Sequence, residues 1–436
     1  MKRVWVTVGI LSLQANLSLA GSLPDAVTHS DFFPVDEGWA RIGRDLFFDP
    51  LLSGNLNIAC ATCHHPSMAS TDTMSLSLGE GGVGLGVDRK PGSRNAPIAR
   101  IPRNAPALFN LGAFEFTNLL HDGRLQTEPD APFGIRMPGA RALQRPVPSV
   151  LSAQGLLPMS SADEMAGHPG ENAIADAVAQ DNFFGSGGAW YIITARVAGN
   201  PTYAERFQPL VGERPLDITD IGRALGEFMN FEFRAIDSPF DRYLAGDTAA
   251  LTEAQARGMD LFYGAAQCDS CHSGPLQTDH GFHAIGMPQF GPGKIAETQA
   301  DTGRGAITGQ EEDNYRFRTP SLRNVAMTAP YGHDGAFATL EGVVRHHLSP
   351  MDSLTSYDRT QAQLHAAPMS ETDWRVMDDD DEVMRIAMSV EIAPVSLTEP
   401  QISDLLEFLG ALSDPSSVEG RLGAPDSLPS GLPLDR

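Results

Sequence analysis

Cysteine is scarce in this chain of 436 residues, which contains four cysteines in all. All four fall in two five-residue groups, residues 60–64 and 268–272, and each group has the pattern Cys-x-x-Cys-His. Because no cysteine lies outside these groups, a framework of stabilising disulfides is excluded.

Positive charge is also in short supply, with 31 Lys and Arg against 55 Asp and Glu and a formal net charge of −24. This balance argues against binding to nucleic acid or to anionic membrane surfaces. It is compatible with a protein partner that has a basic face. No run after residue 20 is apolar enough for a membrane helix, so we expect no membrane span.

The first twenty residues have the pattern of a secretory signal. Lys2 and Arg3 precede an apolar segment at residues 4–13, and small residues follow at 18–20. This order predicts a signal peptide over residues 1–20. We therefore expect an exported protein, located in the periplasm of a bacterial cell.

Each Cys-x-x-Cys-His group predicts covalent attachment of one c-type haem. The thioether-forming cysteines would be Cys60, Cys63, Cys268 and Cys271, and the proximal iron ligands would be His64 and His272. A zinc site would need a second pair of ligands close to each cysteine pair. The histidine that already follows each pair favours haem.

The order of landmarks repeats along the chain. Each haem group is followed by an Asn- and Pro-containing segment, at 103–110 and at 319–324, and then by His-Asp-Gly. The distance from the haem His to His-Asp-Gly is 57 residues (64 to 121) and 61 residues (272 to 333). The repeat predicts two cytochrome c-like haem domains related by internal duplication.

We place these domains at residues 21–215 and 216–415. The fold class is mainly α, because apolar residues recur at helical spacing, as at Ile218, Ile221, Leu225 and Phe228. Thr252 with Gln255 and Thr398 with Gln401 have capping-box spacing. Residues 416–436 are rich in Pro, Gly and Ser and are expected to be disordered.

An iron that reacts with peroxide needs one open axial position. Between His64 and His121 the only other histidine is the adjacent His65, so the first haem is expected to lack a sixth protein ligand, although Met68 and Met74 remain candidates. In the second half, either His346 or His347 could close the iron.

The motifs resemble those of the bacterial diheme cytochrome c peroxidases and their relative MauG over residues 38–414. The most specific segments are residues 102–106, 122–124 and 319–335. The resemblance implies that His64 serves a peroxidatic haem and His272 an electron-transfer haem. It also implies a distal pair, Gln154 and Glu164, in which the carboxylate moves a proton during O–O cleavage.

The resemblance further implies one calcium ion between the domains. The matching positions are Asn104, Thr328 and Pro330, whose oxygen atoms suit calcium.

Three positions depart from the family pattern. No distal His precedes Asn104, so the first haem should react without reductive activation. His347 stands where family members place a Met, or a Tyr in the MauG-like enzyme, and bis-His ligation favours ferric iron. His121 replaces a Trp that lies between the haems in relatives; it could carry electrons or bind a propionate.

We expect an enzyme of the cytochrome-c peroxidase type, a periplasmic oxidoreductase that reduces hydrogen peroxide with electrons from a small cytochrome c or cupredoxin. The alternative is a MauG-like enzyme that uses a high-valent haem state to oxidise side chains of a partner protein. A diheme electron carrier is a third interpretation and would leave Gln154 and Glu164 without a task. Homodimers are common in the family, and no residue of this chain requires one.

Overall fold

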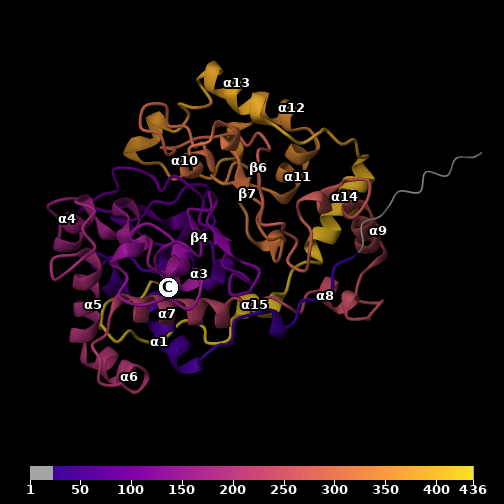
Figure 1. Ribbon diagram of the computed structural model, residues 1–436. Coiled ribbons are helices and arrows are strands. Elements are labelled where there is room, and N and C mark those ends of the chain that lie inside the picture. Colours follow the sequence, from indigo (N-terminus) through magenta and orange to yellow (C-terminus); the bar gives the residue numbers. More distant parts are fainter. Residues whose placement is uncertain (1–22, 436) are drawn as a thin grey trace, which may run out of the picture.

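The computed structural model describes residues 23–435, so the predicted signal peptide lies outside the described residues. The chain is mainly helical with little strand, as predicted. It forms two lobes (Figure 1): an indigo-to-magenta lobe below and an orange-to-yellow lobe above. We call them the first and second lobe. No helix within residues 23–435 is both long and apolar enough to cross a membrane.

The first lobe is organised around two crossing helices, α1 (Glu37–Phe48) and α7 (Ile218–Glu232). Asp36 begins α1 by accepting hydrogen bonds from the backbone N–H groups of Gly38 and Trp39. At the crossing, a Cβ atom on Gly43 would lie 1.8 Å from the carbonyl oxygen of Ala224. The two backbones therefore touch, which only glycine allows.

The second lobe repeats this crossing with α9 (Glu253–Phe262) and α14 (Glu399–Gly410). A Cβ atom on Gly258 would lie 1.9 Å from the carbonyl oxygen of Asp404 and 2.7 Å from Cβ of Phe408. Both predicted capping boxes are present at the starts of these helices. The two lobes share this helix pairing, and their origin by duplication stays a prediction.

Shorter elements complete the lobes. The remaining helices are α2 (Cys60–Cys63), α3 (Val150–Gln154), α4 (Ala173–Ala179), α5 (Ala189–Gly199), α6 (Pro201–Val211), α8 (Pro239–Leu244), α10 (Gly305–Thr308), α11 (Leu340–Leu348), α12 (Pro350–Thr355), α13 (Asp380–Ser389) and α15 (Pro415–Glu419). The antiparallel pairs are β1 (Gly82–Val83) with β2 (Lys90–Pro91), β3 (Asn118–Leu119) with β4 (Leu125–Thr127), β4 with β5 (Ile135–Arg136), and β6 (Phe282–His283) with β7 (Phe317–Arg318).

The boundary between the lobes differs from the predicted one at residue 215. Helix α7 packs on α1 and α3, and its buried residues belong to the core of the first lobe, which extends to Ala235. The apolar face predicted at Ile218, Ile221, Leu225 and Phe228 thus covers the first haem lobe rather than opening the second. The sequence showed that this face would be buried but not which partner would cover it.

The tail at residues 416–436 was expected to be disordered, and the structure differs here as well. After α15 the tail runs back over the first lobe (Figure 1). The buried Glu232 carboxylate accepts hydrogen bonds from the backbone N–H groups of Arg421, Leu422 and Gly423. Leu428 joins the first core, and Asp435 accepts a hydrogen bond from Thr62. These hydrogen bonds fix in place a segment whose composition predicted disorder.

We predict that Gly43→Ala destabilises the haem-loaded protein by about 3 kcal/mol or more, because the new methyl group would meet the α7 backbone. Urea unfolding followed by circular dichroism would measure the change. Gly410→Ala is the matched control, since nothing lies within 4 Å of its Cβ position and alanine favours a helix. Equal destabilisation by both substitutions would refute the close crossing.

Candidate functional site

The first Cys-x-x-Cys-His group is placed by α2 and the loop after it. Cys60 and Cys63 open and close this four-residue helix, and His64 follows directly. The Nδ1–H group of His64 donates to the carbonyl oxygen of Ser70 at 3.0 Å. This bond fixes the orientation and tautomer of the ring and leaves Nε2 free to bind a metal.

The second group repeats the same chemistry. Cys268 lies in a 3-10 helix, Cys268–Ser270, and His272 follows Cys271. The Nδ1–H group of His272 donates to the carbonyl oxygen of Gln277 at 3.1 Å, so here too Nε2 is the free nitrogen. No disulfide links any of the four cysteines. The structure therefore presents two equivalent sets of two thiols and one oriented imidazole.

The site side chains are enclosed by protein yet retain some accessible surface, as expected for groups that face an internal space. Burial raises the pKa of Cys60 and of Cys63 to about 12, although both keep intermediate exposure. Burial, with His347 next in importance, lowers the pKa of His272 to about 4. Thiols and imidazoles that are enclosed by protein but keep some accessible surface fit a covalently attached haem.

The structure favours His347 over His346 as the second axial ligand in the second lobe. His346 is fully buried, and both of its ring nitrogens are engaged: Nε2–H donates to Ile285 O at 2.9 Å, and Nδ1 accepts from Ser353 Oγ at 3.0 Å. His347 donates Nδ1–H to Val343 O at 2.8 Å, which leaves its Nε2 free.

The ring centres of His272 and His347 lie 6.4 Å apart, and the ring planes are tilted by 56° to one another. Two imidazoles that bind one metal ion from opposite sides, through bonds of about 2 Å, would have ring centres about 6.3 Å apart. The spacing therefore fits a bis-His iron. Its assignment to His347 stays a prediction.

Gln154 and Glu164 lie on two short helical elements of the first lobe, with one 3-10 turn, Pro158–Ser160, between them. Gln154 ends α3, and Glu164 lies in a π-helical turn, Ala162–Ala166. The Oε1 atom of Gln154 is buried and has no hydrogen-bond partner among residues 23–435. An orphaned buried acceptor of this kind calls for a ligand that can donate to it.

The charge state of Glu164 is set by competing influences. Burial raises the pKa of its carboxyl group, while the positive charges of Arg124 and Lys294 oppose this rise. Glu164 also affects the pKa values of Cys60 and Cys63, so it is electrostatically close to the first haem attachment site. Lys294 comes from the second lobe, and its role could not be found from any motif.

The two methionines considered as sixth ligands have packing roles. Met74 is buried in the protein, and the Met68 sulfur lies 2.7 Å from the position of a Cβ atom on Gly86. Burial, as for Met74, and a place in a tight gap, as for Met68, are typical of packing methionines. An open distal position on the first haem stays a prediction.

The lobes meet through a buried ion network that the sequence did not reveal. Arg103 donates two hydrogen bonds to Asp301, at 2.7 and 2.8 Å, and a third to Asp122 at 2.6 Å. His121 lies beside this network, and burial, followed by the charge of Arg103, lowers its pKa well below the usual value. Arg103 and Asp122 lie in recognisable motifs, whereas nothing in the sequence marks Asp301.

Among the residues predicted to bind calcium, Asn104 is held by hydrogen bonds from its side chain and its backbone. Asn104 Nδ2 donates to Met74 O at 2.7 Å, which directs the amide oxygen away from that contact. The backbone N–H of Asn104 donates to His333 O at 2.8 Å and so brings residue 104 to the 328–335 segment. Calcium binding by Asn104, Thr328 and Pro330 stays a prediction.

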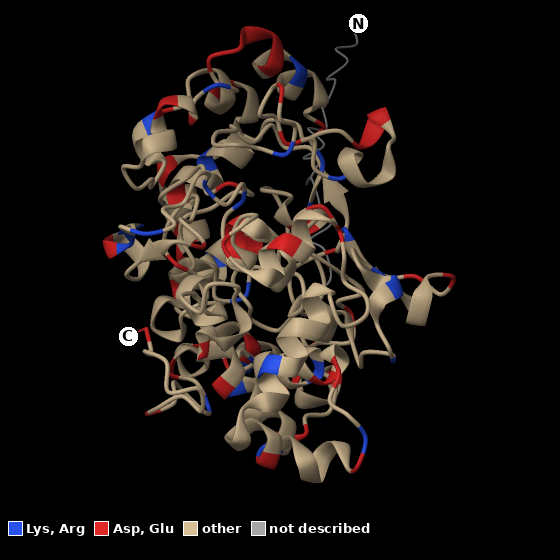
Figure 2. Cartoon of the chain, turned by 90° about the vertical axis from the view of Figure 1, so that its left-hand side faces the viewer, with Lys and Arg blue, Asp and Glu red and all other residues tan. Residues whose placement is uncertain are grey.

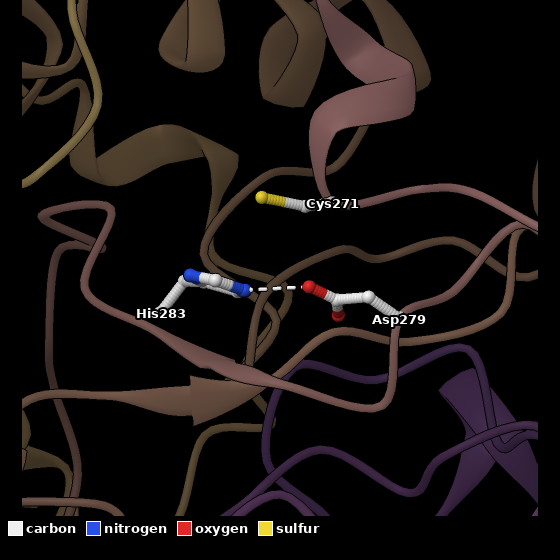
Figure 3. A group of neighbouring side chains, drawn as sticks. All are labelled: Cys271, Asp279 and His283. Atoms are coloured by element: carbon white, nitrogen blue, oxygen red, sulfur yellow. Dashed lines mark hydrogen bonds and ion pairs between the residues drawn. The ribbon is translucent and has the colours of Figure 1, made fainter.

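A further group of metal-ligating side chains lies at the second attachment site. Figure 3 shows Cys271, Asp279 and His283, with His283 Nε2 bonded to Asp279 at 2.8 Å. A thioether to haem would use the Cys271 sulfur, and Glu391 engages Nδ1 of His283 at 3.1 Å. The group therefore provides no third free ligand for another metal.

Comparison with known proteins agrees with this geometry. A family model for di-haem cytochrome c peroxidase matches residues 37–249. The chain is also 30% identical to cytochrome c551 peroxidase of Nitrosomonas europaea over 313 residues, which cover 71% of this chain and 73% of that protein. This chain belongs to the di-haem cytochrome c peroxidase family. It is therefore an oxidoreductase that carries two c-type haems, and the residues described above fit them.

Some similar members of the di-haem peroxidase family have names that do not describe a peroxidase. Methylamine utilization protein MauG of Methylorubrum extorquens is 28% identical over 386 residues, covering 87% of this chain and 85% of that protein. The solved structure of a MauG-like protein associated with microbial copper homeostasis is 26% identical, with a TM-score of 0.60 and coverage of 93% and 97%. The family membership thus includes peroxidase and MauG-like activities.

We predict that His347→Ala converts the second haem from low spin to high spin, because it removes the free imidazole near His272. Low-temperature EPR of the ferric protein would report the change. His346→Gln is the control and should keep the low-spin signal, since His346 holds its neighbours through hydrogen bonds. The opposite pattern would assign the iron to His346.

We predict that Glu164→Gln slows the reaction with peroxide by about 10²- to 10⁴-fold, because the amide cannot accept a proton. Stopped-flow absorbance would measure the rate constant, and Asp163→Asn should change it little.

The pH profile provides a second readout for Glu164. Because burial raises its pKa, the reactive carboxylate is lost as the pH falls through that raised value. The rate constant should therefore fall on the acid side at a higher pH than for an ordinary glutamate, and Glu164→Gln should abolish this limb. An unchanged limb would contradict the role of Glu164.

Proposed function

We propose that this protein reduces hydrogen peroxide at the His64 haem and uses the resulting oxidising equivalents on side chains of a partner protein. The observation that supports this most strongly is the pair of imidazoles, His272 and His347, whose ring centres lie 6.4 Å apart. Two imidazole ligands favour the oxidised iron more than His/Met ligation does. The second haem is then suited to holding oxidising equivalents.

The distal residues of the first haem would manage the proton. The buried, unpartnered Oε1 of Gln154 accepts a hydrogen bond from peroxide and orients it. Glu164 would take a proton from one peroxide oxygen and pass it to the other, which would leave as water. When bound, the haem would supply the two electrons that O–O cleavage requires. Arg124 and Lys294 limit the rise in the pKa of Glu164, which keeps the carboxylate available as a base.

Peroxide reduction with a small redox donor is the second candidate. The 30% identity to a cytochrome c551 peroxidase favours it. In this version a small cytochrome c or cupredoxin returns electrons through the second haem. With two His ligands, the second haem would have a low potential and would accept electrons poorly from a high-potential donor. We therefore place this candidate second.

The surface charge suits a basic partner in either case. Figure 2 shows Asp and Glu residues, in red, distributed over most parts of the chain, in line with the net charge of −24. The acidic run at residues 378–382 has a structural task, since Asp379 caps α13 and the buried Glu382 accepts from Tyr315. We propose the periplasm as the location, because a predicted signal peptide and covalent haem are both typical of exported proteins. A bound calcium ion and a homodimer also stay proposals.

We predict one high-spin and one low-spin ferric haem in the resting EPR spectrum. After one equivalent of peroxide, the oxidised state should persist for long enough to be recorded without a partner. Steady-state turnover with reduced cytochrome c as the donor should be slow.

Rapid turnover with cytochrome c would instead support the second candidate. Two low-spin signals would contradict the open position on the first haem, and would leave a diheme electron carrier or an enzyme that must first lose a ligand.

A further inference from the structure

Three arginines follow one another on the segment around β7, and one of them differs from the others. Arg316 pairs with Glu391 at 2.8 Å, and Arg323 pairs with Asp241 at 2.6 Å. Arg318, between them, forms no ion pair with any acidic side chain among residues 23–435.

Backbone contacts fix Arg318 where the two lobes meet. Its Nε donates to Leu120 O at 3.2 Å, its Nη1 donates to Thr319 O at 3.1 Å, and its backbone N–H donates to His121 O at 2.8 Å. The guanidinium lies 5.7 Å from the ring centre of Phe116. The charge is therefore held in place at the boundary of the two haem lobes.

An unpaired charge in this place is unfavourable. Burial alone lowers the pKa of Arg318 to about 10, with no acidic group to oppose it. Yet the side chain keeps intermediate exposure, and its Nη2 group has no hydrogen-bond partner among residues 23–435. Buried cations are normally paired with an anion.

The neighbourhood indicates what that anion is. Arg318 lies two residues before Pro320, whose backbone carbonyl is near enough to His272 to raise the pKa of its ring. It also contacts the backbone on either side of the Leu120–His121 peptide bond in the first lobe. We propose that Arg318 binds a propionate carboxylate of one of the two haems at the junction of the lobes. A guanidinium fork matches a carboxylate in geometry and charge.

This proposal rests on the two haems of the family, not on the oxidation of a partner protein. A cation beside a haem carboxylate stabilises the more reduced iron, because reduction removes one positive charge nearby. Arg318 is thus a positioning residue that would raise the midpoint potential of the haem it contacts.

The test is a redox titration of the haem-loaded protein, followed by absorbance and EPR so that the two haems are resolved. Arg318→Gln should shift the midpoint potential of one haem downward, and Arg318→Lys should restore part of the shift. Arg316→Gln is the matched control on the same segment and should shift the potential less, because the charge of Arg316 is already paired with Glu391. A shift of the low-spin haem assigns the propionate to the second haem, and a shift of the high-spin haem assigns it to the first.

Unchanged potentials in Arg318→Gln, or an equal shift in Arg316→Gln, would overturn the proposal. If Arg318→Gln does not load two haems, resonance Raman spectra of Arg318→Lys decide instead. A moved propionate bending band supports the contact, and an unmoved band refutes it. None of these readouts depends on a partner protein, so they remain interpretable if the proposed function fails.

Discussion

The relation between the two haem sites depends on a buried ion network, with a second buried pair, Arg100 and Asp373, across the same lobe boundary. Arg103 of the first lobe meets Asp301 of the second through two parallel hydrogen bonds and meets Asp122 through a third, and all three side chains are almost completely buried. Such a network adds little net stability, because each charge loses its hydration. It does impose geometry, since any other relative placement of the lobes would leave a buried charge unpaired.

Within each lobe, one hydrogen bond from a histidine to a backbone carbonyl decides which ring nitrogen is available. His64 and His272 use Nδ1 for this bond, and so does His347. His346 and His347 are neighbours on α11, but successive residues on a helix point about 100° apart. One imidazole is therefore fixed in the core by two bonds, and the other lies near His272.

Much of this arrangement was predictable from the sequence, because covalent chemistry demands fixed local patterns. The helical class and the presence of two haems follow from spacing alone, and the roles of the individual cysteines and histidines stay predictions. The choice between His346 and His347 did not follow, because it depends on Ser353 and Ile285, which no pattern links to them.

The lobe boundary could not be predicted from the sequence either, since the apolar face of α7 could have covered either lobe. The composition of residues 416–436 suggested disorder because apolar residues are few. What holds this tail is a set of backbone N–H groups bonded to Glu232, and backbone groups leave no trace in composition. The roles of Asp301 and Lys294 were missed for a similar reason. They are single charged residues in loops, and no sequence pattern links them to their distant partners.

The course of this tail has a consequence for how the molecule is made. Residues near 428–435 complete a core that begins at Val27 and contact Thr62 inside the first haem attachment motif. The amino-terminal lobe therefore cannot reach its final packing while the chain is still being synthesised, although helices α1 and α7 are made early. Contacts of such large sequence separation form slowly. Thr62, between Cys60 and Cys63, therefore gains its carboxylate partner only when the last residues settle over the lobe.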